Sequence, residues 1–183
     1  MGTTRILKDD GSKQNLSVED AIKMYKSTPG QIYSKAFFKK RHLKDNNWKV
    51  RLGELFVKRY SLESLVDFGC GEGEYLAGAL KAGVKKVLGF EYLFENVKKY
   101  LSVESLGHIK YGNVMEEIDC GKFDCSMSIE VAEHILPEKS DVFVANLVNA
   151  SKKYILLTAA SPGQGGVARG RRDGRHHLGR ERA

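Results

Sequence analysis

The sequence predicts an α/β protein whose parallel sheet is covered by helices on both faces. Short apolar segments recur along most of the chain, and segments of helical length and pattern separate them. A glycine-rich turn directly follows the first apolar segment. Connections of this length suit right-handed crossovers between parallel strands. The predicted strands are residues 65–68, 86–90, 108–111, 123–128 and 154–160, and the predicted helices among them are residues 74–82, 94–105 and 140–149.

The segment before the first predicted strand favours helices. Residues 1–15 are polar, and we expect them to be frayed. In the last of the expected helices, Leu52, Leu55 and Phe56 form the apolar face that should pack against the sheet. The expected helices are residues 18–26, 33–43 and 48–60.

The composition of this 183-residue chain, 42% hydrophobic and 29% charged, is that of a globular domain. Its net charge of +7 is uneven, because residues 167–183 contribute +4 through six of the ten arginines. This tail indicates a disordered segment foreign to the fold, and an arm that folds on nucleic acid is the less favoured alternative. No apolar run reaches the length of a membrane helix, and the three cysteines fit no disulfide framework, so we expect a cytoplasmic protein.

The glycine turn points to a nucleotide-like ligand. Gly69, Gly71 and Gly73 alternate between a strand and a helix, in a G-x-G-x-G spacing that differs from the G-x-G-x-x-G of pyrophosphate-binding turns. Asp67 precedes the first glycine, where its carboxylate can hold a cationic amino group. Glu91 ends the second predicted strand, where an acid can accept the two ribose hydroxyls. Acids on both sides favour a sulfonium ligand, S-adenosylmethionine (SAM), over a dinucleotide.

The segments DFGCGEGEY, GFEYL, YGNV and FDCSMSIEVAEHI, in this order, resemble the class I SAM-dependent methyltransferases over residues 65–162. The resemblance implies a Rossmann-like fold whose glycine loop wraps the methionine part of SAM, with Asn113 at the adenine edge. Asn113 stands where the family commonly has Asp, and its amide can still hydrogen-bond adenine. The cofactor-binding residues expected on this basis are Asp67, Gly69, Cys70, Gly71, Gly73, Glu91, Tyr92, Asn113, Val114 and Ile129.

Two acids and a histidine follow the fourth predicted strand. If Glu130 opens a helix, Glu133 and His134 share its face. Such a group could bind a divalent cation or supply a general base, and Glu130 and His134 are the candidate catalytic residues. The segment resembles the E-x-x-E-H of the ubiquinone-pathway O-methyltransferases and the small-RNA 3′-terminal 2′-O-methyltransferases, in which these residues bind Mg²⁺. The alternative is a glutamate that supports the SAM loop without any metal.

The expected activity is methyl transfer from SAM to an oxygen or nitrogen of a small molecule or an RNA end. Residues 1–60 would form a lid, residues 61–166 the SAM-binding domain and residues 167–183 the tail. The family sheet ends in an antiparallel strand pair that is missing here, so a truncated, inactive SAM-binding domain is the alternative. An NAD-dependent dehydrogenase is disfavoured by the glycine spacing. The sequence indicates neither the acceptor nor an oligomeric state.

Overall fold

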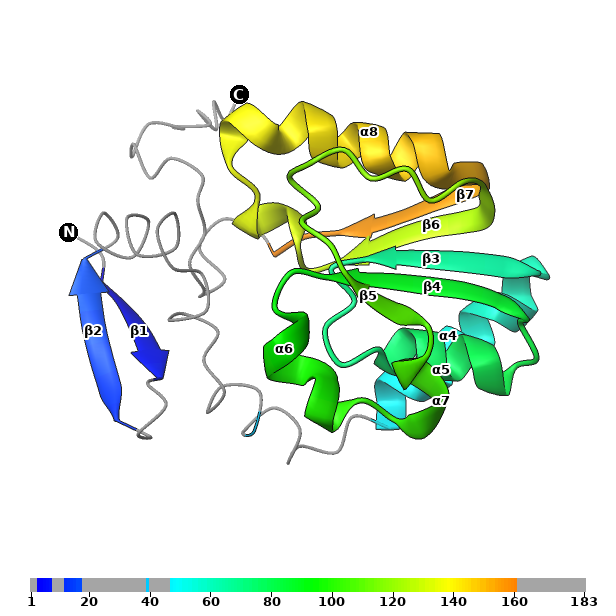
Figure 1. Cartoon of the computed structure of the whole chain (residues 1–183), viewed down its shortest axis with the longest axis horizontal. Coiled ribbons are helices and arrows are strands. Elements are labelled where there is room, and N and C mark those ends of the chain that lie inside the picture. Colours follow the sequence, from blue (N-terminus) through cyan, green and yellow to red (C-terminus); the bar gives the residue numbers. More distant parts are fainter. Residues whose placement is uncertain (1–2, 8–11, 18–38, 40–46, 161–183) are drawn as a thin grey trace, which may run out of the picture.

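The computed structural model describes residues 3–7, 12–17, 39 and 47–160 (Figure 1). Near the amino terminus, β1 (Thr3–Leu7) pairs antiparallel with β2 (Lys13–Ser17). The expectation that residues 1–15 are frayed is therefore wrong for these strands, because backbone pairing orders polar segments that have no apolar pattern. The helices predicted over residues 18–26 and 33–43, and the tail 167–183, lie outside the described residues.

Five parallel strands form the main sheet, in the order β5-β4-β3-β6-β7 (Figure 1). The chain enters at the central strand β3, steps outward through β4 and β5, and returns to β6 on the other side of β3. Sheets with such a reversal bind ligands in the crevice beyond the carboxyl ends of the strands on either side of it, which are β3 and β6 here. The strands are β3 (Ser64–Phe68), β4 (Lys86–Glu91), β5 (Ile109–Tyr111), β6 (Phe123–Ile129) and β7 (Ser151–Thr158).

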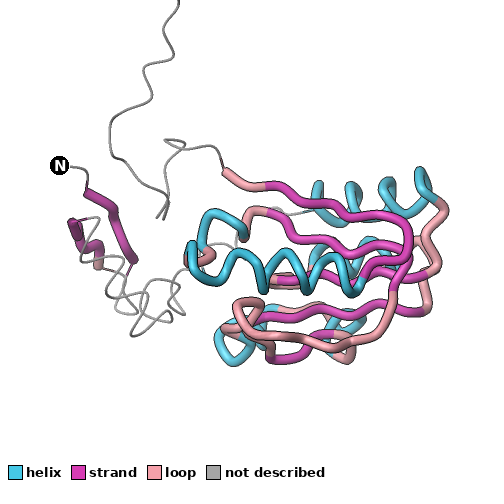
Figure 2. Tube along the Cα trace, turned by 90° about the horizontal axis from the view of Figure 1, so that it is seen from above, coloured by secondary structure: helices cyan, strands magenta, loops and turns pink. Residues whose placement is uncertain are grey.

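Helices cover both faces of this sheet, as predicted (Figure 2). Helices α4 (Asn47–Tyr60) and α5 (Glu74–Lys81) pack on one face, and α8 (Ser140–Ala150) packs on the other. Side chains of a strand alternate between the faces, so Leu65 and Asp67 of β3 point toward α5 whereas Val66 and Phe68 point toward α8. The carboxylate of Asp67 thus lies on the face that α4 and α5 cover.

The buried side of α4 differs from the predicted one. Leu52 and Leu55 are 48% and 62% exposed, whereas Lys49, Gly53 and Val57 are buried. The prediction for Leu52 and Leu55 is therefore wrong. Its physical reason is that α4 packs on α5 through a glycine rather than through a leucine stripe.

Reciprocal glycines bring the backbones of α4 and α5 into contact. A Cβ on Gly53 would lie 2.5 Å from the carbonyl oxygen of Tyr75, and a Cβ on Gly78 would overlap the carbonyl oxygen of Val50. Only residues without a side chain permit so close an approach. Residues 50–54 of α4 therefore lie against residues 75–78 of α5, the helix that directly follows the glycine turn.

The helix predicted over residues 94–105 is divided into short turns. Leu101 is extended, at φ −66° and ψ 142°, and the Ser102 hydroxyl accepts a hydrogen bond from the Ser105 N–H at 3.1 Å. A serine that caps a new turn competes with a continuous helix, which explains the break. The pieces are α6 (Phe94–Val97), the 3₁₀ turn Lys98–Tyr100 and α7 (Val103–Leu106).

Strand β7 forms one edge of the sheet and starts at Ser151 rather than at residue 154. Three of its apolar side chains, Tyr154, Ile155 and Leu157, are 41%, 47% and 44% exposed. Among the described residues, no helix combines the length and the apolar character needed to cross a membrane.

Candidate functional site

The glycine turn between β3 and α5 has the backbone that its sequence demands. Gly69, Gly71 and Gly73 all adopt positive φ, at 84°, 56° and 73°. The N–H groups of Gly69 and Cys70 both donate to the carbonyl oxygen of Phe90, at 2.8 and 3.1 Å. The Gly73 N–H donates to Cys70. The turn therefore bends back on the end of β4 and uses its N–H groups internally, unlike a loop that presents them to a pyrophosphate.

Two of these glycines also allow other segments to approach the turn. A Cβ on Gly69 would lie 2.6 Å from Cγ2 of Val131, and a Cβ on Gly73 would lie 2.5 Å from Cδ1 of Ile109. Val131 belongs to the segment that follows β6, so this segment lies directly against the glycine turn. The structure thus brings residues 130–134 to the crevice.

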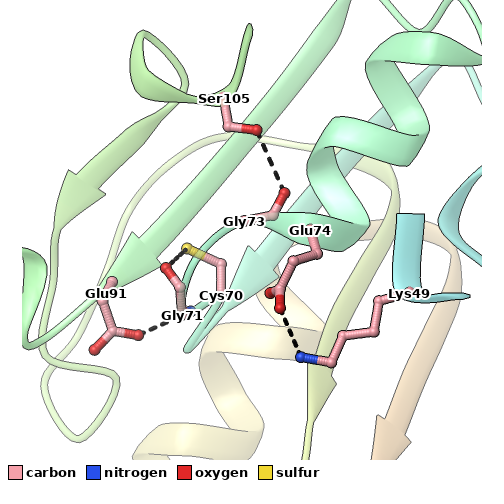
Figure 3. A network of polar contacts seen from close by, with 7 residues as sticks. All are labelled: Lys49, Cys70, Gly71, Gly73, Glu74, Glu91 and Ser105. Carbon is pink, nitrogen blue, oxygen red and sulfur yellow. Dashed lines mark hydrogen bonds and ion pairs between the residues drawn. The ribbon is translucent and has the colours of Figure 1, made fainter. Parts of the chain in front are cut away.

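Glu91 closes one side of the turn, at the end of β4 (Figure 3). Its Oε2 accepts a hydrogen bond from the Gly71 N–H at 2.9 Å, and its Oε1 accepts one from the Leu93 N–H at 2.8 Å. These two bonds fix the carboxylate. A carboxylate has about four acceptor positions, so Glu91 can still accept hydroxyl groups of a ligand.

Asp67 lies at the base of the turn and is 2% exposed. Its Oδ1 is buried and has no hydrogen-bond partner. Burial, reinforced by the charges of Glu74 and Glu91 and opposed by that of Lys49, raises the pKa of Asp67 to about 8. An unsatisfied carboxylate in this place suits a cationic ligand, which would compensate the buried charge.

Cys70 and Tyr92 occupy different surroundings within the predicted cofactor set. Cys70 is 5% exposed, and burial raises the pKa of its thiol well above the usual value, so it is not a reactive thiolate. Tyr92 is 36% exposed, and its ring centroid lies 5.8 Å from that of Tyr111. Tyr92 and Tyr111 therefore offer an aromatic surface just beyond Glu91.

The predicted adenine-side residues are partly engaged elsewhere. The amide of Asn113 donates to Glu116 Oε1 at 2.9 Å and accepts from the Met115 N–H at 3.1 Å, so it shapes its own loop. Val114 is buried in the apolar cluster beneath α8, and Ile129 packs against the cluster on the opposite face. Their side chains therefore belong to the core.

The helix predicted to open at Glu130 is not formed. Glu130 has a left-handed φ of 58°, and its Oε1 accepts a hydrogen bond from the Thr158 hydroxyl at 3.0 Å. The 3₁₀ turn Ala132–His134 follows, and Oε1 of Glu133 lies 3.8 Å from Nε2 of His134. Glu130 is thus held to the end of β7 and does not share a face with the other two side chains.

The metal site predicted at Glu130, Glu133 and His134 is not formed in the part of the chain that the structure describes. There, no three His, Cys, Asp or Glu side chains are grouped in a way that could hold a metal ion. Glu133 and His134 remain close to the glycine turn. Oε2 of Glu133 is buried without a hydrogen-bond partner, and the His134 side chain is 24% exposed.

Lys49 is a site residue that the sequence analysis missed. Its Nζ lies 2.7 Å from Oε1 of Glu74, the first residue of α5, and both side chains are 11% exposed (Figure 3). Helical spacing was the available signal, because Lys49 is one turn from Gly53 and two turns from Phe56 on the same face. This spacing places Lys49 on the side of α4 that packs on α5.

Asn146 of α8 is a second residue that sequence reasoning missed. Its Oδ1 accepts from the Ile118 N–H at 2.9 Å, and its Nδ2 donates to the carbonyl oxygens of Val114 and Glu116 at 3.1 and 2.8 Å. The side chain is 4% exposed. Asn146 thus fixes the loop that carries Asn113. No local sequence pattern predicts this role, because its partners lie 28 to 32 residues away in the chain.

Solved methyltransferase structures are similar to this chain. The sugar N-methyltransferase KedS8 from a Streptoalloteichus species matches with a TM-score of 0.53 and 15% identity, over 70% of this chain and 54% of that chain. The methyltransferase domain of bacterial CtHen1 matches with a TM-score of 0.48 and 22% identity, over 61% and 66%. A SAM-dependent methyltransferase from Archaeoglobus fulgidus matches with a TM-score of 0.48 and 22% identity, over 62% and 54%.

No protein family and no curated protein matches the sequence. This chain spans from about half to about two thirds of the length of the three solved chains. At these identities the likeness concerns the fold alone, and the match to KedS8, at a TM-score of 0.53, supports it. The strand order, the parallel pairing and this match show that the chain has a Rossmann-like α/β fold, which it shares with the methyltransferase KedS8.

Proposed function

We propose that this protein binds SAM and transfers its methyl group to an oxygen or nitrogen nucleophile. The observation that carries the proposal is the carboxylate of Asp67, which is buried at the carboxyl end of β3 and keeps Oδ1 without a partner. The ammonium group of SAM would supply the missing donor, and its positive charge would favour the ionised form of Asp67. Glu91, at the end of β4, is in the position to accept the ribose hydroxyls.

The charge around the turn favours this ligand over a dinucleotide. The negative charges of Glu74 and Glu91 reach Asp67 and raise its pKa. The positive charge of Lys49 also reaches Asp67 and partly offsets their effect. Such a surplus of acids attracts a sulfonium and an ammonium group and repels a pyrophosphate. The internally bonded N–H groups of Gly69 and Gly71 agree with this preference.

The bound cofactor would supply a methyl group that is already activated by the sulfonium. The task of the protein is then to hold the acceptor in line with that methyl group and to exclude water. We assign the acceptor side to His134, which lies in the segment that touches the glycine turn, as the base that removes a proton from the nucleophile. Glu133, 3.8 Å away, would orient the imidazole. The acceptor is a small molecule or an RNA end.

Isothermal titration calorimetry tests the binding step. We expect heat with SAM and with S-adenosylhomocysteine, and none with NAD. The absence of heat with both adenosyl ligands would overturn the proposal. The transfer step is tested with methyl-labelled SAM and separate pools of small metabolites and short RNAs, where the fraction that gains the label identifies the acceptor class.

The variant His134→Ala separates binding from transfer. We expect it to bind SAM as the parent protein does and to lose about 100-fold or more in transfer rate. Equal transfer rates in the two proteins would remove His134 from the assignment and leave cofactor binding intact.

A further inference from the structure

Lys49 of α4 is a buried charged residue that has no role in the function proposed above. Lys49 lies in the first turn of α4 and is 9% exposed. Its Nζ donates a hydrogen bond to Oε1 of Glu74 at 2.7 Å (Figure 3). Lysines are seldom buried, because removing the ammonium group from water is costly unless it is paired. The burial of Lys49 next to the glycine turn therefore indicates a structural or ligand-binding role for its ammonium group.

The position of Lys49 is fixed by the contact between α4 and α5. Gly53 lies one turn further along α4, and the missing side chain lets the helix approach the backbone of Tyr75. Glu74 directly follows Gly73, the left-handed residue that precedes α5. The ammonium group of Lys49 consequently lies at the end of the glycine turn, on the same face of the sheet as Asp67.

Lys49 and Asp67 carry opposite charges on the same face of the sheet, next to the glycine turn. The positive charge of Lys49 acts on Asp67 and offsets part of the rise of its pKa, so the two groups lie within electrostatic reach. Asp67 keeps a buried oxygen without a partner. Lys49 has three donors, and the hydrogen bond to Glu74 uses one of them. An anionic acceptor beside a cationic donor is the complement of an α-amino acid zwitterion.

We propose that Lys49 binds the carboxylate at the amino acid end of SAM, beside the ammonium group held by Asp67. This assignment rests on the proposed function, and it makes α4 a part of the cofactor site. Glu74 holds the ammonium group of Lys49 in place before the ligand binds. After binding, this ammonium group would donate hydrogen bonds both to Glu74 and to the carboxylate of SAM. No covalent step is involved.

The test compares two ligands that differ only in the carboxylate, SAM and decarboxylated SAM, by calorimetry on the full chain. We expect the parent protein to bind SAM about tenfold or more tightly, the usual effect of a charge-assisted hydrogen bond. Lys49→Met should lose this preference and bind decarboxylated SAM to within about twofold of the parent protein. Lys49→Arg keeps the charge and should retain part of the preference.

Lys49→Met leaves Glu74 buried without its partner, which can unfold the protein. The double variant Lys49→Met/Glu74→Met removes both charges together and should show the same loss of preference. Glu74→Gln keeps the lysine and should keep the preference. If the Lys49 variants weaken both ligands equally, the ion pair has only a structural role and the assignment is wrong.

The outcomes also separate this inference from the proposed function. A parent protein that binds both ligands with equal affinity overturns the role of Lys49 and leaves SAM binding standing. A parent protein that binds neither ligand overturns the proposed function and this assignment with it.

Discussion

Replacing Asp67 by Asn should stabilise the protein free of cofactor and abolish SAM binding. Asn has nearly the shape of Asp but carries no charge, so it removes the cost of burying a carboxylate whose Oδ1 has no partner. The pKa of Asp67 is about 8 in the folded protein, against an ordinary value of 3.8. Each unit of difference corresponds to about 1.36 kcal/mol, which sets an upper limit of about 6 kcal/mol for the cost.

The pH dependence of this cost has a definite sign. Between about pH 4 and pH 8, folded Asp67 retains a proton that the unfolded chain has released. The free energy of unfolding of the parent protein therefore falls as the pH rises through this window. In Asp67→Asn this contribution is missing. Even a third of the limit, about 2 kcal/mol, would raise the melting temperature by about 4–8 °C at pH 8.

Thermal denaturation at several pH values between 5 and 8.5 measures the effect. The matched control is Asp124→Asn, because the Glu63 N–H and Lys153 lower the pKa of Asp124. That variant should be less stable by a constant amount over the whole range. The reasoning is refuted if the difference between Asp67→Asn and the parent protein is the same at pH 5 and at pH 8.

Three further variants and one control variant test the packing of the site and the sheet edge. Gly78→Ala, whose Cβ would overlap the backbone of Val50, should lower the free energy of unfolding by about 1–3 kcal/mol in urea denaturation, while Gly107→Ala, which meets no atom within 4 Å, should change it little. Gly69→Ala should weaken SAM binding by calorimetry, because φ is 84° there and Val131 lies in the way. Ile155→Lys on the exposed edge strand β7 should reduce any concentration-dependent association in analytical ultracentrifugation, and unchanged association would exclude this edge as its cause.

The strands and the glycine turn could be predicted because their signals are local. Short apolar runs between turn residues predicted β3 and β6, which are buried along nearly their whole length, and positive φ at Gly69, Gly71 and Gly73 is needed by the turn itself. Asp67 and Glu91 followed from their places at the ends of two strands. The surroundings of these two acids could not be predicted, because they depend on how the strands pack. Oδ1 of Asp67 has no hydrogen-bond partner, and the Glu91 carboxylate accepts hydrogen bonds from two backbone N–H groups.

The errors concern residues whose surroundings come from distant parts of the chain. The spacing of Glu130 and His134 suits a helix, but Glu130 is bonded to Thr158, 28 residues away, once β6 and β7 pair. Leu52 is exposed although it was predicted to pack on the sheet, and Lys49 is buried, because Gly53 decides which side of α4 meets α5. Local periodicity shows that a helix has a buried side, and a single glycine can change which side it is.

The same contact explains why α4 belongs to the site although it precedes the strand and helix that hold the glycine turn. Asp67 and Glu74 are fixed by β3 and α5, and both are acids in a buried region, so together they would repel each other strongly. Lys49 reduces that repulsion, and Gly53 and Gly78 let it come near enough to do so. One lysine does not satisfy two carboxylates, however, because Asp67 still keeps an unbonded oxygen. Asp67 therefore lacks one positively charged hydrogen-bond donor, and the ammonium group of an amino acid ligand would supply it.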